Sequence, residues 1–259
     1  MTITRSDSCG TSQGFKSIRH LSELQDDTLE ALDAICRVRR YSAGQTVVFD
    51  GEHAEFIGCV KTGFLRMQKS LADGREHIVG LLVEGDMFGR VYNGPLHFGI
   101  EAATDAEICA FQRAPFEALL TRTPDLERVV MLNILNELDR ARDWMILLSN
   151  QRGSARVAGF LLILCTRFVG IDHILRVNEH RLEVKVPISR SDLAHLLGIR
   201  PESISRAFHA LADLGCIEIV RPDLMRILDF EALADAAGEE DLQLSPNLLQ
   251  TIGALQGRT

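Results

Sequence analysis

The chain has 259 residues, of which 46% are apolar and 25% are charged. This composition is typical of a folded globular protein and excludes bulk disorder and collagen-like repeats, and the length favours two domains. The formal charge of −8 argues against a protein that coats nucleic acid without selectivity, although a local basic face is compatible with it. No apolar run approaches the ~20 residues that span a bilayer, so we expect a cytoplasmic protein with no membrane partner.

Six cysteines are spread along the chain, at positions 9, 36, 59, 109, 165 and 216. Tetrahedral zinc sites usually draw on close pairs of ligands, and the sequence contains no CxxC pair. In a chain without a secretion signal the thiols are expected to stay reduced. Because unpaired cysteine is among the most buried residue types, we expect most of these side chains to fill core positions.

The hydrophobic period changes near residue 40. Apolar residues recur mostly every three or four positions over 21–37, which predicts an amphipathic helix. From Tyr41 to about Phe111, short β-rich runs alternate with turn signals such as Asp50-Gly51, Thr62-Gly63 and Asp73-Gly74. Many short strands at near-regular spacing predict a small antiparallel barrel or roll. The expected strands are Thr46–Phe49, Phe56–Val60, Phe64–Lys69, His77–Val83 and Glu107–Phe111.

After Pro124 the pattern is helical again, without a break until about Asn150. One stripe has the four-three spacing of a coiled-coil seam, and a second apolar stripe runs beside it. We expect one stripe to cover the barrel and the other to meet a second copy of the chain; the alternative is a long helix packed inside a monomer. The seam consists of Met131, Leu135, Leu138, Arg142 and Met145, with Asp139 and Ile146 beside it, and the second stripe consists of Val130, Ile134, Ala141 and Leu148.

The next 80 residues predict a winged helix-turn-helix. A helix, a strand, two short helices joined by a glycine-containing turn, and a hairpin follow one another. Ser189 is placed to cap the first short helix, Gly198 to end it, and Pro201 to begin the second. The expected elements are the helix Ser154–Val169, a strand through Leu182, Val184 and Val186, a helix through His195, a helix to about Leu214, and the strands Ile217–Val220 and Met225–Leu228.

The second short helix carries the residue types that read DNA. Residues 151–230 have a net charge of +2, which is weak support for DNA binding by itself. Glu202, Ser205 and Arg206 lie on one helix face, where arginine can donate to guanine, glutamate can accept from cytosine, and serine can contact a base edge. The alternative is an ordinary solvated face with an intrahelical Glu202–Arg206 pair. We expect phosphate contacts from Arg190, Ser203 and His209.

Three motifs carry a family resemblance: Gly85-Asp86-Met87-Phe88-Gly89, Asp139–Met145 and Glu202-Ser203-Ile204-Ser205-Arg206. Through them the chain resembles the CRP/FNR superfamily of bacterial transcription regulators, and the third motif is similar to the E-x-x-S-R pattern of its FNR/FixK branch. The resemblance covers roughly 21–235 and is greatest with the alphaproteobacterial FnrL proteins. The resemblance implies an α+β fold with an antiparallel β-roll of the cyclic-nucleotide-binding kind. It also implies double-stranded DNA and RNA polymerase as partners.

The effector is where the chain departs from the family pattern. Members that bind cyclic AMP carry a Glu after the GDxxG turn and an Arg-Ser pair before the last strands; here Arg90 and Leu96-His97 stand at those places, so cyclic AMP is not expected. FNR proteins hold a 4Fe–4S cluster with three clustered N-terminal cysteines and one in the roll. Cys109 matches the roll ligand, but Cys9 is alone near the N-terminus, and a cluster needs about four thiolates.

Other signals stay open. Control by abundance or by an unidentified ligand has three alternatives. These are an atypical cluster, haem held by an axial histidine, and a thiol switch at Cys216, which directly follows the second short helix. The candidate redox or cluster thiols are Cys9, Cys109 and Cys216, and the haem candidates are His20, His53, His77 and His97.

No HExxH, P-loop, GxSxG or Cys/His nucleophile arrangement is present in the sequence, so we expect no enzyme. The predicted function is that of a dimeric CRP/FNR-type regulator that binds an FNR-like palindrome. The expected organisation is a flexible segment 1–20, a β-roll sensor domain 21–124, a dimerisation helix 125–150, a DNA-binding domain 151–236 and a tail 237–259.

Overall fold

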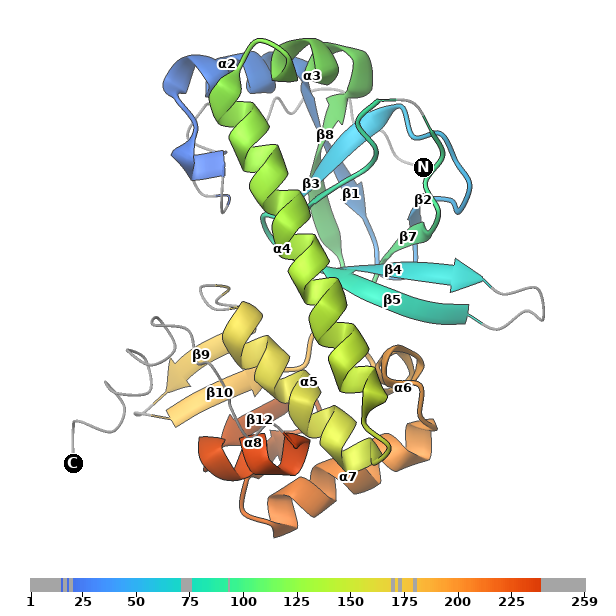
Figure 1. Ribbon diagram of the computed structural model, residues 1–259, viewed down its shortest axis with the longest axis vertical. Coiled ribbons are helices and arrows are strands. Elements are labelled where there is room, and N and C mark those ends of the chain that lie inside the picture. Colours follow the sequence, from blue (N-terminus) through green and yellow to red (C-terminus); the bar gives the residue numbers. More distant parts are fainter. Residues whose placement is uncertain are drawn as a thin grey trace. The chain divides into compact units, whose positions relative to one another are not determined.

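The computed structural model describes residues 15, 18, 21–70, 76–92, 94–168, 171, 174–178 and 181–238 (Figure 1). The chain divides into two compact units, residues 1–139 and 140–259. Among the described residues, no helix is both long enough and apolar enough to cross a membrane. Most of the predicted segment 1–20, the Asp73-Gly74 turn and nearly all of the predicted tail lie outside the described residues.

The first unit is an antiparallel β-roll of two four-stranded sheets, as the sequence predicts. The strand orders are β1-β8-β3-β6 and β2-β7-β4-β5. In Figure 1, α2 and α3 lie together at one end of the roll, beside the first turns of α4. The elements of this unit are η1 (Leu21–Glu23), α2 (Asp26–Ile35), β1 (Cys36–Tyr41), β2 (Thr46–Val48), β3 (Phe56–Thr62), β4 (Leu65–Ser70), β5 (Glu76–Leu82), β6 (Met87–Phe88), β7 (Gly99–Ala102), β8 (Ala106–Gln112) and α3 (Arg113–Leu120).

Two apolar clusters fill this unit, one on each face of β3 and β8. Cys59 and Cys109 belong to the cluster beneath α2 and α3, whereas Val60 and Ile108 belong to the cluster between the sheets. Successive residues of a strand point to opposite faces, so a strand that is covered on both faces is apolar throughout. For this reason Phe56 to Val60 are all buried.

The predicted single helix over 21–37 is wrong at both ends. Leu21–Glu23 is a separate 3-10 helix, η1, and α2 begins only at Asp26. The helix α2 stops at Ile35, and Cys36 already has an extended conformation. Residues Cys36 to Tyr41 pair with β8 in the register Cys36↔Phe111 to Tyr41↔Ala106. Three arginines in the sequence CRVRRY hide the apolar alternation of a strand. Pairing with a segment seventy residues away, rather than local propensity, therefore decides this boundary.

The long helix α4 (Pro124–Ser149) is continuous, as predicted, but the stripe expected to cover the roll is wrong. Ile134, Ala141 and Leu148 are exposed and Val130 is only half-buried. The buried face contains two polar residues, Asn133 and Arg140, which is why an apolar pattern does not reveal it. Its members are Leu126, Val129 and Asn133 in the first unit, and Arg140, Trp144 and Leu147 in the second.

The second unit has the helices and strands of a winged helix-turn-helix. Its sheet has the order β11-β12-β10-β9. The helix α5 packs against α7 and α8 (Figure 1). Ten of its 15 residues are buried. Besides α4, the elements are α5 (Gly153–Arg167), β9 (Leu175–Asn178), β10 (Arg181–Lys185), α6 (Arg190–Leu197), α7 (Pro201–Asp213), β11 (Ile217–Arg221), β12 (Leu224–Ile227) and α8 (Phe230–Ala237).

Candidate DNA-binding surface

The turn between α6 and α7 is built from short-range signals. The Ser189 hydroxyl accepts a hydrogen bond from the amide of Asp192 at 3.0 Å and caps α6. Gly198 has φ of +61°, the left-handed conformation that glycine adopts at low cost, and its amide donates to the carbonyl of Ala194. Pro201 occupies the first position of α7, where its missing N–H leaves no bond unmade. These three predictions are confirmed.

The helix α7 buries one face and presents the other to solvent. Ile204, Ala207, Phe208 and Leu211 are buried. Glu202, Ser205, Arg206 and His209 are exposed, and Ser203 is half-buried. Within the described part of the chain, Glu202 and Arg206 form no ion pair with each other or with another residue, so the intrahelical pair considered as an alternative is absent there. The exposed face thus offers one carboxylate, one hydroxyl and one guanidinium on adjoining turns.

Arg190 joins α6, α7 and the wing, which is the hairpin of β11 and β12 with its turn at Pro222 and Asp223. Its guanidinium carbon lies 3.8 Å from the centroid of the Phe208 ring, and its Nη2 donates to the carbonyl of Pro222 in the wing turn. Partial burial lowers the pKa of Arg190, and Asp223 opposes this shift. Because an arginine pKa is so far above neutrality, the side chain stays charged. The residue predicted to touch phosphate is therefore held at the junction of three elements, and the phosphate contact itself stays a prediction.

The wing is tied to the rest of the domain by a chain of ion pairs that the sequence does not reveal. Arg226 on β12 donates to Glu183 on β10 at 2.8 Å and to Glu218 on β11 at 2.7 Å. The hydrogen bonds from Arg226 to Glu183 and Glu218 raise the pKa of Arg226. The amide of Val186, just before α6, donates to the carbonyl of Asp223 in the wing turn at 2.8 Å. The wing turn and the start of α6 are thereby held next to each other.

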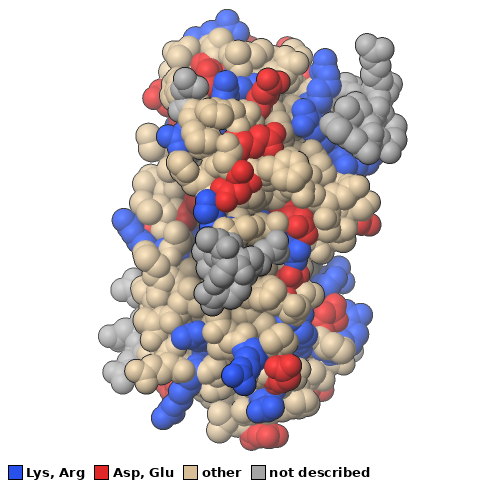
Figure 2. Space-filling model, turned by 90° about the vertical axis from the view of Figure 1, so that its right-hand side faces the viewer, with Lys and Arg blue, Asp and Glu red and all other residues tan. Residues whose placement is uncertain are grey.

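The charged surface is mixed in sign. Figure 2 shows Lys and Arg side chains interspersed with Asp and Glu on the face that it presents. The helix-turn-helix therefore has isolated cations at defined places, such as Arg190 and Arg206, on a chain with a net negative charge. Such placement suits selective binding better than coating of any polyanion.

The seam residues of α4 are exposed. The apolar members Met131, Leu135, Leu138, Met145 and Ile146 are 45–65% exposed, although they are large hydrophobic side chains. The charged positions Asp139 and Arg142 are also exposed. A run of exposed apolar side chains along one helix is typical of a surface that another protein chain covers.

The roll does not bring its cysteines to a common open site. Cys36, Cys59 and Cys109 are fully buried in the apolar cluster beneath α2 and α3, and Cys59 lies directly opposite Cys109 in the register of β3 and β8. Among the described residues, no three His, Cys, Asp or Glu side chains are grouped so as to hold a metal ion. Cys9 and His20 lie outside the described residues.

The remaining candidate effector residues have ordinary surroundings. Burial raises the pKa of Cys216 above its usual value, which disfavours the reactive thiolate. His53 and His97 are exposed and His77 is half-buried. The side chain of Arg90 packs over Gly94, so closely that a Cβ atom added to Gly94 would lie 2.7 Å from the Nε of Arg90. Leu96 is buried in the cluster between the sheets.

Together, the roll, the capped helix-turn-helix and the wing define a winged helix-turn-helix protein of the class that regulates transcription. Two family models match the chain: the Crp-like helix-turn-helix domain over residues 155–236 and the cyclic nucleotide-binding domain over residues 38–123. The transcriptional activator protein FnrL of Cereibacter sphaeroides is 32% identical over 86% of this chain and 90% of its own length. The nitrogen fixation regulation protein FixK of Bradyrhizobium diazoefficiens is 33% identical over 83% and 89%.

A solved structure agrees with these matches. FixK2 from Bradyrhizobium japonicum has a TM-score of 0.68 and 25% identity, and the match covers 78% of this chain and 97% of that protein. The chain belongs to the CRP/FNR family of DNA-binding transcription regulators, in its FNR/FixK branch.

Proposed function

We propose that the protein binds as a homodimer to an FNR-like palindrome with TTGAT-type half-sites and thereby regulates genes of oxygen or redox metabolism. The observation that carries this proposal is the exposed trio of Glu202, Ser205 and Arg206 on α7. These side chains match the E-x-x-S-R pattern of the FNR/FixK branch, and each can bond a base edge in the major groove. Phosphate contacts from Arg190, Ser203 and His209 are part of the same proposal.

Dimerisation is proposed through α4. Its exposed apolar seam has coiled-coil spacing, and burial of such side chains against the same surface of a second copy stabilises a dimer. A twofold dimer presents two recognition helices, which matches a palindrome read as two half-sites. The name of the FnrL relative, a transcriptional activator protein, supports an activator, for which RNA polymerase is the expected partner.

A gel shift tests the proposal directly. The full chain is titrated against a duplex with a TTGAT-containing palindrome and against one with scrambled half-sites, at 0.15 M salt. We expect binding at least about a thousandfold tighter to the palindrome, the lower end for specific regulators. Equal affinity for the two duplexes would refute sequence-specific binding of this site.

For the signal, we propose that the protein holds no oxygen-labile iron–sulfur cluster of the usual kind. The described cysteines are buried among apolar side chains, and no three of them are grouped as ligands. We expect similar DNA binding for protein purified with and without oxygen. The alternatives are an atypical cluster, haem or a thiol switch. Anaerobic reconstitution that gives about four irons per chain together with oxygen-sensitive DNA binding would overturn the proposal in favour of a cluster.

A further inference from the structure

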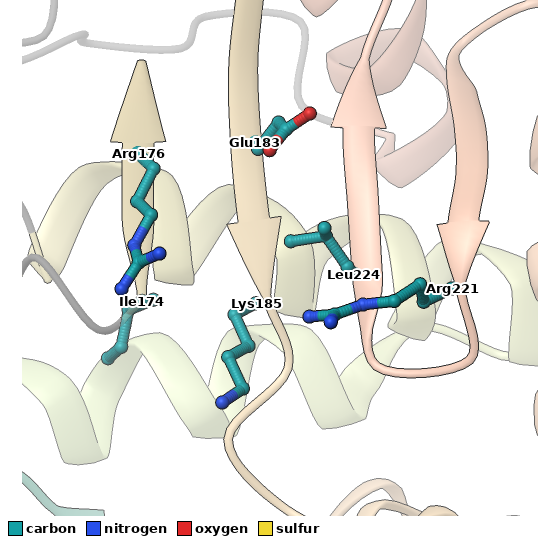
Figure 3. Close-up of a pocket in the computed structure, with 6 residues that line it drawn as sticks. All are labelled: Ile174, Arg176, Glu183, Lys185, Arg221 and Leu224. Atoms are coloured by element: carbon teal, nitrogen blue, oxygen red, sulfur yellow. The ribbon is translucent and has the colours of Figure 1, made fainter. Parts of the chain in front are cut away.

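The wing sheet, which has the strand order β11-β12-β10-β9, carries a hollow on its outer face. No residue of α7, the proposed recognition helix, lines this hollow. Its volume is about 140 Å³, and it is lined by Ile174, Arg176, Glu183, Lys185, Arg221 and Leu224. Three of these six residues are cations, and each comes from a different strand. Figure 3 shows the basic side chains on β9, β10 and β11, with Leu224 between Lys185 and Arg221.

The register of the sheet explains why these residues meet. Glu183 lies opposite Arg176 on β9 and opposite Arg226 on β12. Two residues further along, Lys185 lies opposite Leu224, which in turn lies opposite Arg221. Residues two apart on a strand share a face, so the two rows lie side by side on the outer face. The neighbouring Leu182 and Val184 are buried on the other face.

The balance of charge in the hollow favours an anion. The carboxylate of Glu183 is already bonded to Arg226 at 2.8 Å, and Figure 3 shows it at the far end of the group from Lys185. Arg221 has a half-buried partner, Asp223, at 3.5 Å. Lys185 is exposed and, within the described residues, makes no ion pair. Several donors on separate strands around a small hollow suit the oxygens of a tetrahedral oxyanion, above all a phosphate.

The position of the hollow connects it to the DNA-binding residues. Arg221 begins the wing turn, and the next residue, Pro222, accepts the hydrogen bond from Arg190. Arg190 in turn stacks on Phe208 of α7. A continuous series of contacts therefore runs from the hollow through the wing turn to the recognition helix. Because the hollow is linked to α7 in this way, a duplex bound at α7 is the nearest source of phosphate for it.

We propose that this hollow binds a backbone phosphate of the DNA, with Lys185 and Arg221 as the main donors. The inference rests on the proposed function of α7 and adds to it a contact that carries no base information. Neutralising such a contact weakens binding to every sequence by the same factor, because the phosphate is present whatever the bases are. It also removes counterion release, so the dependence of affinity on salt becomes shallower.

The test compares Lys185→Gln and Arg221→Gln with Arg181→Gln. Arg181 is an exposed residue of the same strand as Lys185 but does not line the hollow, so it is a matched control for the loss of one positive charge. Affinity for the palindrome and for a scrambled duplex is measured at salt concentrations from about 0.05 to about 1 M. This range covers more than about one decade of counterion concentration, which the salt slope requires. Thermal unfolding of all variants confirms that each is folded.

If the proposal is right, Lys185→Gln or Arg221→Gln lowers the log–log salt slope by about 0.9 per protomer, or about 1.8 per dimer. Over one decade of rising salt the affinity of the wild type therefore falls about 60-fold further than that of the variant, so the variant's deficit is largest at low salt, and it is equal for both duplexes. Arg181→Gln keeps the wild-type slope. If both hollow variants behave as Arg181→Gln does, or if they lose affinity for the palindrome alone, the phosphate assignment is overturned.

Two further outcomes separate this inference from others. If the wild type does not prefer the palindrome, the proposed function is refuted. If the wild type prefers the palindrome but the hollow variants behave like Arg181→Gln, only the phosphate contact in the hollow is refuted. Calorimetry with inorganic pyrophosphate and no DNA tests a free anion as the ligand. Pyrophosphate binding that Lys185→Gln abolishes, with DNA binding unchanged, would assign the hollow to a small molecule and overturn the DNA contact.

Discussion

Arg190 and Phe208 are stacked, with the guanidinium carbon 3.8 Å from the centroid of the ring. The side chain of the first residue of α6 thereby rests on α7, and its Nη2 also donates a hydrogen bond to the carbonyl of Pro222 in the wing turn. A cation close to an aromatic face contributes about 0.5–2 kcal/mol, depending on how far it is desolvated. This pair therefore serves both stability and the placement of a positive charge.

The Arg190→Ala variant should lose both roles. We expect the DNA-binding domain to be destabilised by about 1–2 kcal/mol, and binding to all sequences to weaken with a shallower salt slope. Arg190→Lys keeps the charge but not the planar stack. If Arg190→Lys restores the salt slope without restoring the unfolding midpoint, the phosphate contact and the stacking are separate functions. An unchanged salt slope in Arg190→Ala would show that Arg190 is purely structural.

Arg206 is expected to read a guanine in each half-site. Arg206→Ala should cost about 1–3 kcal/mol per half-site and relax discrimination at one base pair, because a bidentate donor to guanine O6 and N7 is lost. Competition with a series of single-base variants of the palindrome measures this. An equal loss on palindromic and random DNA would contradict base reading by this residue.

The exposed seam of α4 predicts the oligomeric state. Leu135→Glu places a charge on the apolar surface and should convert the dimer to a monomer in sedimentation experiments, with little change in thermal unfolding of the roll, since Leu135 is exposed within the chain. Asn136→Glu, which adds the same charge at an exposed position of α4 outside the seam, is the matched control. A wild-type protein that sediments as a monomer both with and without DNA would eliminate the proposed dimer.

Asn133 fastens α4 to the roll. Its Oδ1 accepts from the amide of Met87 at 3.1 Å, and its Nδ2 donates to the carbonyl of Gly85 at 3.2 Å. Asn133→Ala leaves these two groups without partners and should lower the free energy of unfolding by about 2–4 kcal/mol. The exposed Asn136 provides a control, since Asn136→Ala should change stability by less than about 0.5 kcal/mol. If denaturant titrations gave similar losses in the free energy of unfolding for Asn133→Ala and Asn136→Ala, this role of Asn133 would be contradicted.

Asp125 predicts a specific loss of stability in acid. Burial would raise the pKa of this carboxyl, but hydrogen bonds from the amide of Gln25 and the hydroxyl of Thr28 outweigh it and lower the pKa below the ordinary value. A carboxyl whose folded pKa is depressed stabilises the fold above its unfolded pKa and loses that contribution as the pH falls. Asp125→Asn should therefore be less stable than the wild type at neutral pH.

The difference between Asp125→Asn and the wild type should shrink as the pH falls below about 4, where the unfolded aspartate becomes protonated. Urea titrations at a series of pH values measure it. A difference that stays constant down to acidic pH would show that the carboxylate charge contributes nothing and that only the shape of the side chain matters.

The core of the candidate site could be predicted from residues that are neighbours in the sequence. Ser189 caps through Asp192, Gly198 and Pro201 delimit the turn, and Glu202 and Arg206 share a face because they are four residues apart. All these relations act within about one helical turn, so they follow from local geometry whatever the rest of the chain does. The continuous α4 and the change of period at the roll could be predicted for the same reason.

Other features depended on pairing between distant segments. β1 exists because Cys36–Tyr41 lie against β8, and Lys185, Leu224 and Arg221 form one row only in the register of the wing sheet. The buried face of α4 includes Asn133, whose partners on Gly85 and Met87 are almost fifty residues away. A polar side chain becomes a core residue when a distant backbone satisfies its hydrogen bonds, and no periodicity along the chain records that partner.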